Sequence, residues 1–228
     1  MISKFVAILK RANDILRTEG LKTLLKRGFA FARVFFFDYG EYFLYEHPLL
    51  VERNENDYLP KIKDFTLKII SSNKEADELA AATGYDFRRR FVSARRSLDK
   101  GAIAFCIFVK GEIVHIGFVA MSEEAKNTFD PMPYKVDFSN NEACTGGTET
   151  VPEYRSKGLM GYVYFKRFQY LREKGKVLSR NAVEKSNIAS QKSHAKFGPR
   201  LCAEARYLKL LGWRFWKEKP LAQAAPHD

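Results

Sequence analysis

Apolar residues near the N-terminus recur every three or four positions, which predicts amphipathic helices. One such stripe runs from Ile2 to Leu16, and a second helix follows Gly20. Residues 1–33 have a net charge of +6, from eight Lys or Arg and two acidic residues. Nine aromatic residues lie between positions 29 and 45. We therefore predict a basic, aromatic-rich helical extension over residues 1–63.

A different pattern begins near Asp64, where short alternating or apolar runs predict strands that are separated by helices. The clearest signal is a hairpin centred on Lys110 and Gly111. Strands are predicted over about residues 64–72, 102–109, 112–121, 142–151 and 176–184, with two more over 200–218; helices are predicted over 73–84, 86–101, 159–174 and 186–198, and a loop over 122–141. This order predicts an α/β domain over residues 64–219, in which helices flank a mixed sheet, and a flexible tail over residues 220–228.

The composition indicates a folded chain with anionic partners. Apolar residues make up 46% of the 228 residues, and the net charge is +12. The three cysteines are far apart and form no CxxC pair, so we expect neither a disulfide framework nor a metal site. No run of about 18 apolar residues predicts a transmembrane helix. A cytoplasmic protein fits these features, with peripheral contact at the inner membrane face as a further option.

The stretch VPEYRSKGLMGYVYFKRF, residues 151–168, combines a basic, glycine-bearing turn with the start of a helix. The first amides of a helix lack intrahelical acceptors, and the helix dipole adds positive potential there. Glycine allows close approach to the backbone, and Arg155 and Lys157 add charge. This pattern predicts a phosphate-binding site. The alternative is an ordinary basic loop.

Residues 64–217 resemble the GNAT superfamily of acyl-CoA-dependent N-acyltransferases. The family signature, Arg or Gln followed by Gly at the fourth position, matches Arg155 and Gly158, although Met160 stands where a small residue is usual. A second signature, Asn-x-x-Ser followed by Lys-x-Gly, matches residues 187–198, but His194 occupies the usual Tyr position. The resemblance implies a mostly antiparallel GNAT-like sheet.

The resemblance also implies acetyl-CoA or another acyl-CoA as co-substrate, with no metal. Its pyrophosphate would lie on the turn, and its pantetheine between the strands 142–151 and 176–183. A backbone N–H of the first strand would polarise the thioester carbonyl. The implied binding residues are Val151, Arg155, Ser156, Lys157, Gly158, Leu159, Met160, Gly161, Asn187 and Ser190.

Three residues are candidates for proton transfer. Glu142 corresponds in position to the general base of histone-type members, and Glu149 is an alternative closer to the turn. The competing interpretation of Glu142 is a surface glutamate at a strand start. His194 is the candidate acid for the departing thiolate, and its alternative is a histidine on the helix surface. Cys144 fits a packed cysteine better than a nucleophile.

We therefore expect an N-acyltransferase that acts on a small-molecule amine such as an amino sugar, with acetyl as the first expected acyl group. The alternative is a catalytically silent protein that binds acyl-CoA or nucleic acid. The Gly158–Gly161 spacing of a GxxG loop is the only nucleic-acid signal, and the polar residues before it argue against that partner. Residues 1–45 are expected to pack on the domain, to form a homodimer, or to contact a membrane surface.

Overall fold

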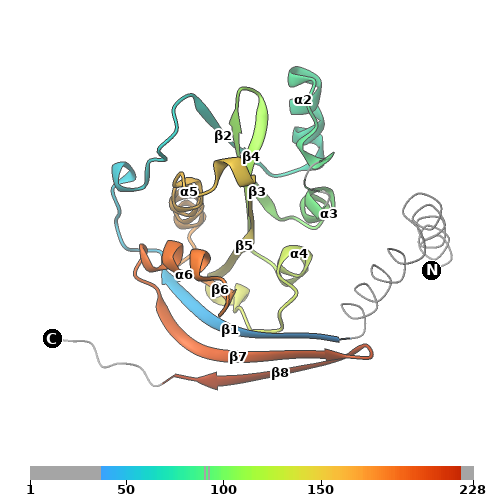
Figure 1. The fold of residues 1–228 in the computed structure, drawn as a ribbon, viewed down its shortest axis with the longest axis vertical. Helices are drawn as coiled ribbons and strands as arrows, with labels where there is room; N and C mark the ends of the chain where they lie inside the picture. Colours follow the sequence, from blue (N-terminus) through green and yellow to red (C-terminus); the bar gives the residue numbers. More distant parts are fainter. Residues whose placement is uncertain (1–36, 90, 92, 222–228) are drawn as a thin grey trace. The chain divides into compact units, whose positions relative to one another are not determined.

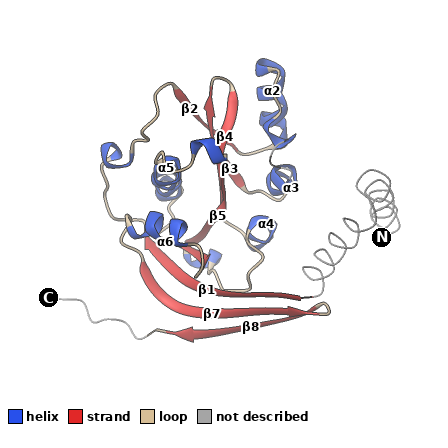
Figure 2. Ribbon diagram, in the orientation of Figure 1, coloured by secondary structure: helices blue, strands red, loops and turns tan. Residues whose placement is uncertain are grey.

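The computed structural model describes residues 37–89, 91 and 93–221, which build an eight-stranded sheet flanked by helices (Figure 1; Figure 2). The strand order is β2-β3-β4-β5-β6-β1-β7-β8. The strands are β1 (Phe37–Pro48), β2 (Phe65–Ile70), β3 (Ile103–Val109), β4 (Glu112–Ala120), β5 (Glu142–Thr150), β6 (Leu178–Glu184), β7 (Arg200–Leu210) and β8 (Trp213–Pro220). The described α-helices are α2 (Asn73–Thr83), α3 (Ser93–Asp99), α4 (Glu123–Phe129), α5 (Leu159–Glu173) and α6 (Ile188–Ala195). Short 3-10 helices are η1 (Glu55–Tyr58), η2 (Phe87–Arg89), η3 (Phe138–Asn140) and η4 (Pro152–Tyr154).

The strand pairings confirm the predicted mixed, mostly antiparallel sheet. Strands β2, β3, β4 and β5 pair antiparallel in succession, and β1 pairs antiparallel with β6. Strands β5 and β6 pair in parallel over three residue pairs, from Glu142 opposite Leu178 to Cys144 opposite Arg180. The predicted hairpin is β3–β4, and its turn places Lys110 and Gly111 at positive φ.

Helices cover both faces of the central strands (Figure 2). On one face, Val163 and Phe168 of α5 pack with Phe105 of β3 in the main apolar core. On the other face, Phe108 of β3 meets Phe87 edge-on, with ring centroids 6.4 Å apart. Strand β3 is therefore buried on both faces, which explains its continuous apolar run.

Helix α5 lies at the centre of this arrangement, with nine of its fifteen residues buried. The sheet covers one side of α5, and the segment around η1 covers another. The Glu55 carboxylate of η1 accepts a hydrogen bond from Tyr162 and pairs with Lys166 at 2.8 Å. None of the helices that the structure describes is long and apolar enough to span a membrane.

Two predicted segments differ in the structure. Residues 37–48 were predicted within a helical extension, which is wrong, because they form β1 and pair with β6. The domain boundary at residue 64 therefore excludes a strand of the sheet. The predicted loop over 122–141 contains α4, which begins after a Ser122 side chain that accepts a bond from the Ala125 amide. The predicted helices over residues 1–36 lie outside the described residues.

The described residues divide into two compact units. The larger contains residues 42–205 and 218–221, and thus every described α-helix. The smaller contains residues 37–41 and 206–217, the ends of β1, β7 and β8. Within the smaller unit, Arg206 Nε lies 3.0 Å from Glu41 Oε1. The candidate site described next belongs wholly to the larger unit.

Candidate active site

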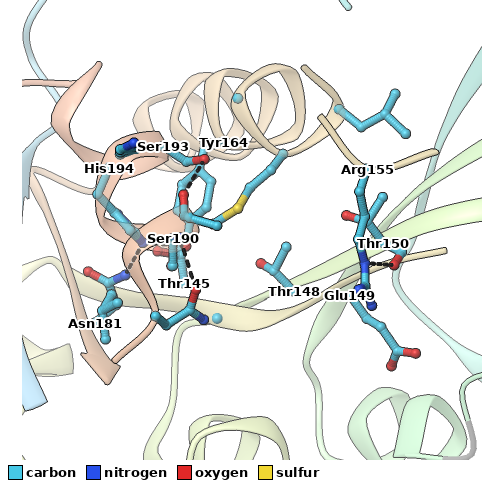
Figure 3. A pocket seen from close by; sticks show the side chains of 18 of the residues that line it. Thr145, Thr148, Glu149, Thr150, Arg155, Tyr164, Asn181, Ser190, Ser193 and His194 are labelled. Atoms are coloured by element: carbon cyan, nitrogen blue, oxygen red, sulfur yellow. Dashed lines mark hydrogen bonds between the residues drawn. The ribbon is translucent and has the colours of Figure 1, made fainter. Parts of the chain in front are cut away.

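A cleft of about 830 Å³ opens where β5 and β6 separate (Figure 3). The parallel pairing ends at Cys144 and Arg180. Beyond that point β5 continues along β4, whereas residues 181–184 of β6 pair with β1. The cleft is lined by residues 145–150 of β5, residues 181–184 of β6, the turn before α5, and α6. Its volume is that of a pocket for a ligand of cofactor size.

A β-bulge shapes the β5 wall of the cleft. The pairing of β4 with β5 shifts register between Ile116 and Phe118, beside Gly146 and Gly147. The buried Arg167 of α5 stabilises this bulge, because its Nη1 donates to the carbonyl oxygens of Phe118 and Gly146, each at 3.2 Å. Among the described residues, no carboxylate pairs with this guanidinium, so its charge is compensated by carbonyl and hydroxyl dipoles.

The turn before α5 forms the anion-binding end of the cleft. Ser156 and Gly158 adopt φ values of 61° and 85°, and α5 begins at Leu159. The first backbone bond of the helix runs from the Tyr162 N–H to the Gly158 carbonyl at 3.1 Å. The amides of residues 159–161 therefore have no intrahelical acceptor. A Cβ on Gly161 would meet no heavy atom within 4 Å, which shows open space at this point.

Tyr164, Asn181 and His194 form a polar network at the other end of the cleft (Figure 3). The His194 Nε2 atom lies 3.1 Å from the Tyr164 hydroxyl and 3.0 Å from Asn181 Nδ2. Its Nδ1 lies 2.9 Å from Nε2 of His47 on β1. Since the Asn181 amide donates to Nε2, the ring proton of His194 resides on Nδ1 and points to His47.

Both histidines of this network are neutral at physiological pH. Burial lowers the pKa of His47 to about 3, and the charges of Arg53 and Arg167 act in the same direction. Burial also lowers the pKa of His194 well below its ordinary value, with further contributions from His47 and Arg167. The cleft wall therefore contains the neutral imidazole of His194, which is bonded to the neutral ring of His47.

The mixed, mostly antiparallel sheet and the cleft between β5 and β6 agree with the arrangement that the resemblance implies. The chain has a GNAT-like fold. No family model and no curated protein sequence matches the chain.

Solved structures with a similar fold include several GNAT proteins. A GCN5-related N-acetyltransferase-like protein from Streptococcus suis is 14% identical over 86% of this chain and 76% of its own, with a TM-score of 0.48. A GNAT acetyltransferase from Colwellia psychrerythraea is 16% identical over 75% of this chain and 55% of its own, with a TM-score of 0.45. A putative GNAT acetyltransferase from Novosphingobium aromaticivorans is 12% identical over 74% of this chain and 63% of its own, with a TM-score of 0.45. The chain thus spans less than two-thirds of the latter two proteins, and identities this low say nothing about activity.

Most of the predicted cofactor-binding residues line the cleft of this GNAT-like fold. They are Arg155, Ser156, Gly158, Leu159, Met160, Gly161, Asn187 and Ser190. The Asn187 side chain caps α6 by accepting a hydrogen bond from the Ser190 amide at 3.0 Å. Val151 and Lys157 do not line the cleft. Val151 packs in the core, and its amide donates to Val114, whereas the Lys157 ammonium lies over the Tyr154 ring.

The two candidate bases lie in different places. Glu142 is buried outside the cleft, where its carboxylate pairs with Arg180 at 2.8 Å and accepts a bond from the Asp137 amide. Glu142 is thus engaged by two partners and does not line the cleft, so its position does not support a role as base for a substrate there. Glu149 is exposed and lines the cleft. Position therefore favours Glu149 over Glu142 as a base.

His194 lies in the cleft wall and not on the helix surface, since only 1% of its surface is exposed. The neutral ring offers no proton toward the cleft, because its N–H is directed to His47. Cys144 is buried and bonded to the Tyr134 hydroxyl at 3.2 Å, and burial raises the pKa of its thiol, as expected for a packed cysteine.

Sequence reasoning missed Tyr164, Asn181 and Arg167. In the sequence, Tyr164 and Arg167 belong to a helix whose aromatic spacing indicates core packing, and Asn181 is one polar residue within a strand. The only signal available in the sequence was the three-residue spacing of Tyr164 and Arg167, which places two polar residues on one helix face.

Proposed function

We propose that this protein is an N-acyltransferase that moves an acyl group from acyl-CoA directly to the amine of a small molecule. One observation carries the proposal: a single cleft connects the separated β5–β6 pair to the free amides at the start of α5. The thioester arm of an acyl-CoA would lie between the separated strands, and its pyrophosphate would lie on the free amides at the start of α5.

The residues fit the pyrophosphate in three respects. The amides of residues 159–161 lack intrahelical acceptors, and the helix dipole favours an anion there. Gly161 leaves open space beside them. Arg155 lines the cleft and supplies positive charge next to the turn. The separated edge of β5 carries the backbone groups that would polarise a thioester carbonyl.

Acetyl-CoA is the donor that we propose first, and an amino sugar is one acceptor class to test. We propose that the protein is located in the cytoplasm. Contact of residues 1–45 with a membrane surface and homodimer formation remain predictions. A protein that binds acyl-CoA without turnover is the competing proposal, and release of free CoA in the presence of an amine distinguishes the two.

The test uses a charge placed in the open space at Gly161. In Gly161→Glu, the carboxylate would lie beside the bound phosphates, whereas a Glu in the first helical turn is compatible with α5. Gly161→Gln is the matched control of nearly equal size. At an effective dielectric of about 20, two charges about 6 Å apart repel by about 3 kcal/mol, which predicts roughly 100-fold weaker CoA binding.

Isothermal titration of the full chain with CoA measures this difference. We expect Gly161→Gln to bind CoA within about tenfold of the wild type, and Gly161→Glu to bind it roughly 100-fold more weakly. Equal affinities of the two variants, or no CoA binding by the wild type, would overturn the proposed function.

A further inference from the structure

We propose that Tyr164 is the general acid of the acyl transfer, and that His194, bonded to His47, positions its hydroxyl. This inference rests on the proposed function, because it assigns a proton donor to that reaction. A departing thiolate needs a proton, and the Tyr164 hydroxyl is one of the donors that line this end of the cleft.

Tyr164 lines the cleft, although only 2% of its surface is exposed. It reaches the cleft from α5, whereas His194 reaches it from α6. The two side chains meet at 3.1 Å, at the place where Figure 3 shows them facing the same space. A tyrosine on α5 thus supplies a hydroxyl beside a histidine on α6.

The hydrogen bonds assign different roles to the two side chains. The single lone pair of His194 Nε2 is shared between the Asn181 amide and the Tyr164 hydroxyl. The Tyr164 proton is therefore only partly committed and can turn to an acceptor in the cleft. The His194 proton is directed away from the cleft, to His47. Tyr164 can therefore donate its hydroxyl proton into the cleft, and His194 holds the Tyr164 side chain in place.

Arg167 stabilises the phenolate that donation leaves behind. Its guanidinium carbon lies 3.9 Å from the centroid of the Tyr164 ring, and both residues are buried. Burial raises the pKa of Tyr164, and the charge of Arg167 acts in the opposite direction. A buried cation at this distance favours the anionic ring during the reaction.

After the acceptor nitrogen has bonded to the acyl carbon, the C–S bond breaks and its electron pair goes to sulfur. The Tyr164 O–H bond breaks and its proton goes to that sulfur, which gives free CoA thiol. The acceptor nitrogen releases one proton to water, and the Tyr164 phenolate takes one from water. No oxidant, reductant or further reactant is required.

The decisive variant is Tyr164→Phe, which removes one oxygen atom. We expect kcat for CoA release with a mixed panel of amines to fall at least about 100-fold, while the affinity for acetyl-CoA changes less than about threefold. Tyr162→Phe is the matched control, because Tyr162 lies two residues away on α5 and bonds Glu55 outside the cleft. It should retain wild-type turnover.

Two further measurements separate proton donation from structural support. The acetyl thioester of thionitrobenzoate releases a thiolate that needs no proton, so the effect of Tyr164→Phe should shrink to less than about tenfold with this donor. His194→Gln retains an amide that can bond Tyr164, whereas His194→Phe does not. We expect the first to keep more kcat than the second, with acetyl-CoA affinity unchanged in both.

Wild-type kcat in Tyr164→Phe, or an equal loss with both donors, would overturn the role of Tyr164 and leave the proposed function standing. If Tyr164→Phe does not fold, the wild-type rates with acetyl-CoA and with the acetyl thioester of thionitrobenzoate are compared instead. A rate that rises steeply with the acidity of the leaving thiol would contradict Tyr164 as a general acid. A wild-type protein that binds acetyl-CoA without turnover overturns catalysis altogether, and one that does not bind it overturns the proposed function first.

Discussion

Mild acid should destabilise this protein through its buried histidines. His47 and His115 are 0% exposed, and burial lowers the pKa of each to about 3 from an ordinary value of 6.5. His115 contacts the Thr150 hydroxyl at 2.7 Å, and its Nε2 has no partner among the described residues. Both rings are therefore neutral in the folded protein down to about pH 3, whereas in the unfolded chain they bind a proton near pH 6.5.

The size of the effect follows from proton linkage. A folded pKa below the unfolded value means that stability is fully present above pH 6.5 and is lost as the pH falls toward 3. Between pH 7 and pH 5 each ring lowers the free energy of unfolding by about 2 kcal/mol, so His47 and His115 together lower it by about 4 kcal/mol. The lowered pKa of His194 acts in the same direction. A loss of this size is a large part of the stability of an ordinary domain.

Urea unfolding, followed by far-ultraviolet circular dichroism at pH 7 and pH 5, measures this loss. His115→Asn keeps a polar group near Thr150 and removes one titrating ring. Whatever its stability at pH 7, its loss between the two pH values should be about 2 kcal/mol smaller than that of the wild type. A wild type that is equally stable at both pH values, or a variant with the wild-type loss, would refute the reasoning.

Two other predictions concern the cleft and its support. A Cβ at Gly117 would lie 2.9 Å from Arg167 Nη1, so Gly117→Ala should lower the free energy of unfolding by about 1–3 kcal/mol, measured by urea unfolding; a stable variant would show that Arg167 adjusts freely. Glu142→Gln should lower stability by about 1–3 kcal/mol through its bonds to Arg180 and Asp137, yet leave the pH dependence of CoA release unchanged. Rate recovery of that variant at high pH would instead support Glu142 as the base.

Local signals in the sequence were enough for much of the fold. The β3–β4 hairpin follows from two apolar runs around Lys110 and Gly111, and the turn before α5 follows from glycine and basic residues at a helix start. These features depend on neighbours in the chain, so their pattern determines them. The cleft residues on that turn were predicted for the same reason.

Features that depend on distant partners were not predictable from the pattern. Strand β1 pairs with β6, whose paired residues lie 130 to 142 positions later, and the many aromatic residues of β1 obscure its alternation. Glu142 looked like a free carboxylate because its partner Arg180 lies 38 residues away. Likewise, the contact between Tyr164 and His194 joins two helices, and neither helix alone indicates it.

Backbone amide exchange with and without acetyl-CoA tests the central claim most directly. The full chain should bind acetyl-CoA, and the amides of residues 155–161 and 145–150 should exchange more slowly in the complex, because those segments line the cleft. Exchange elsewhere on the central strands, which are buried already, should change little. Binding that protects other segments and leaves residues 155–161 unchanged would contradict the account, as would the absence of binding.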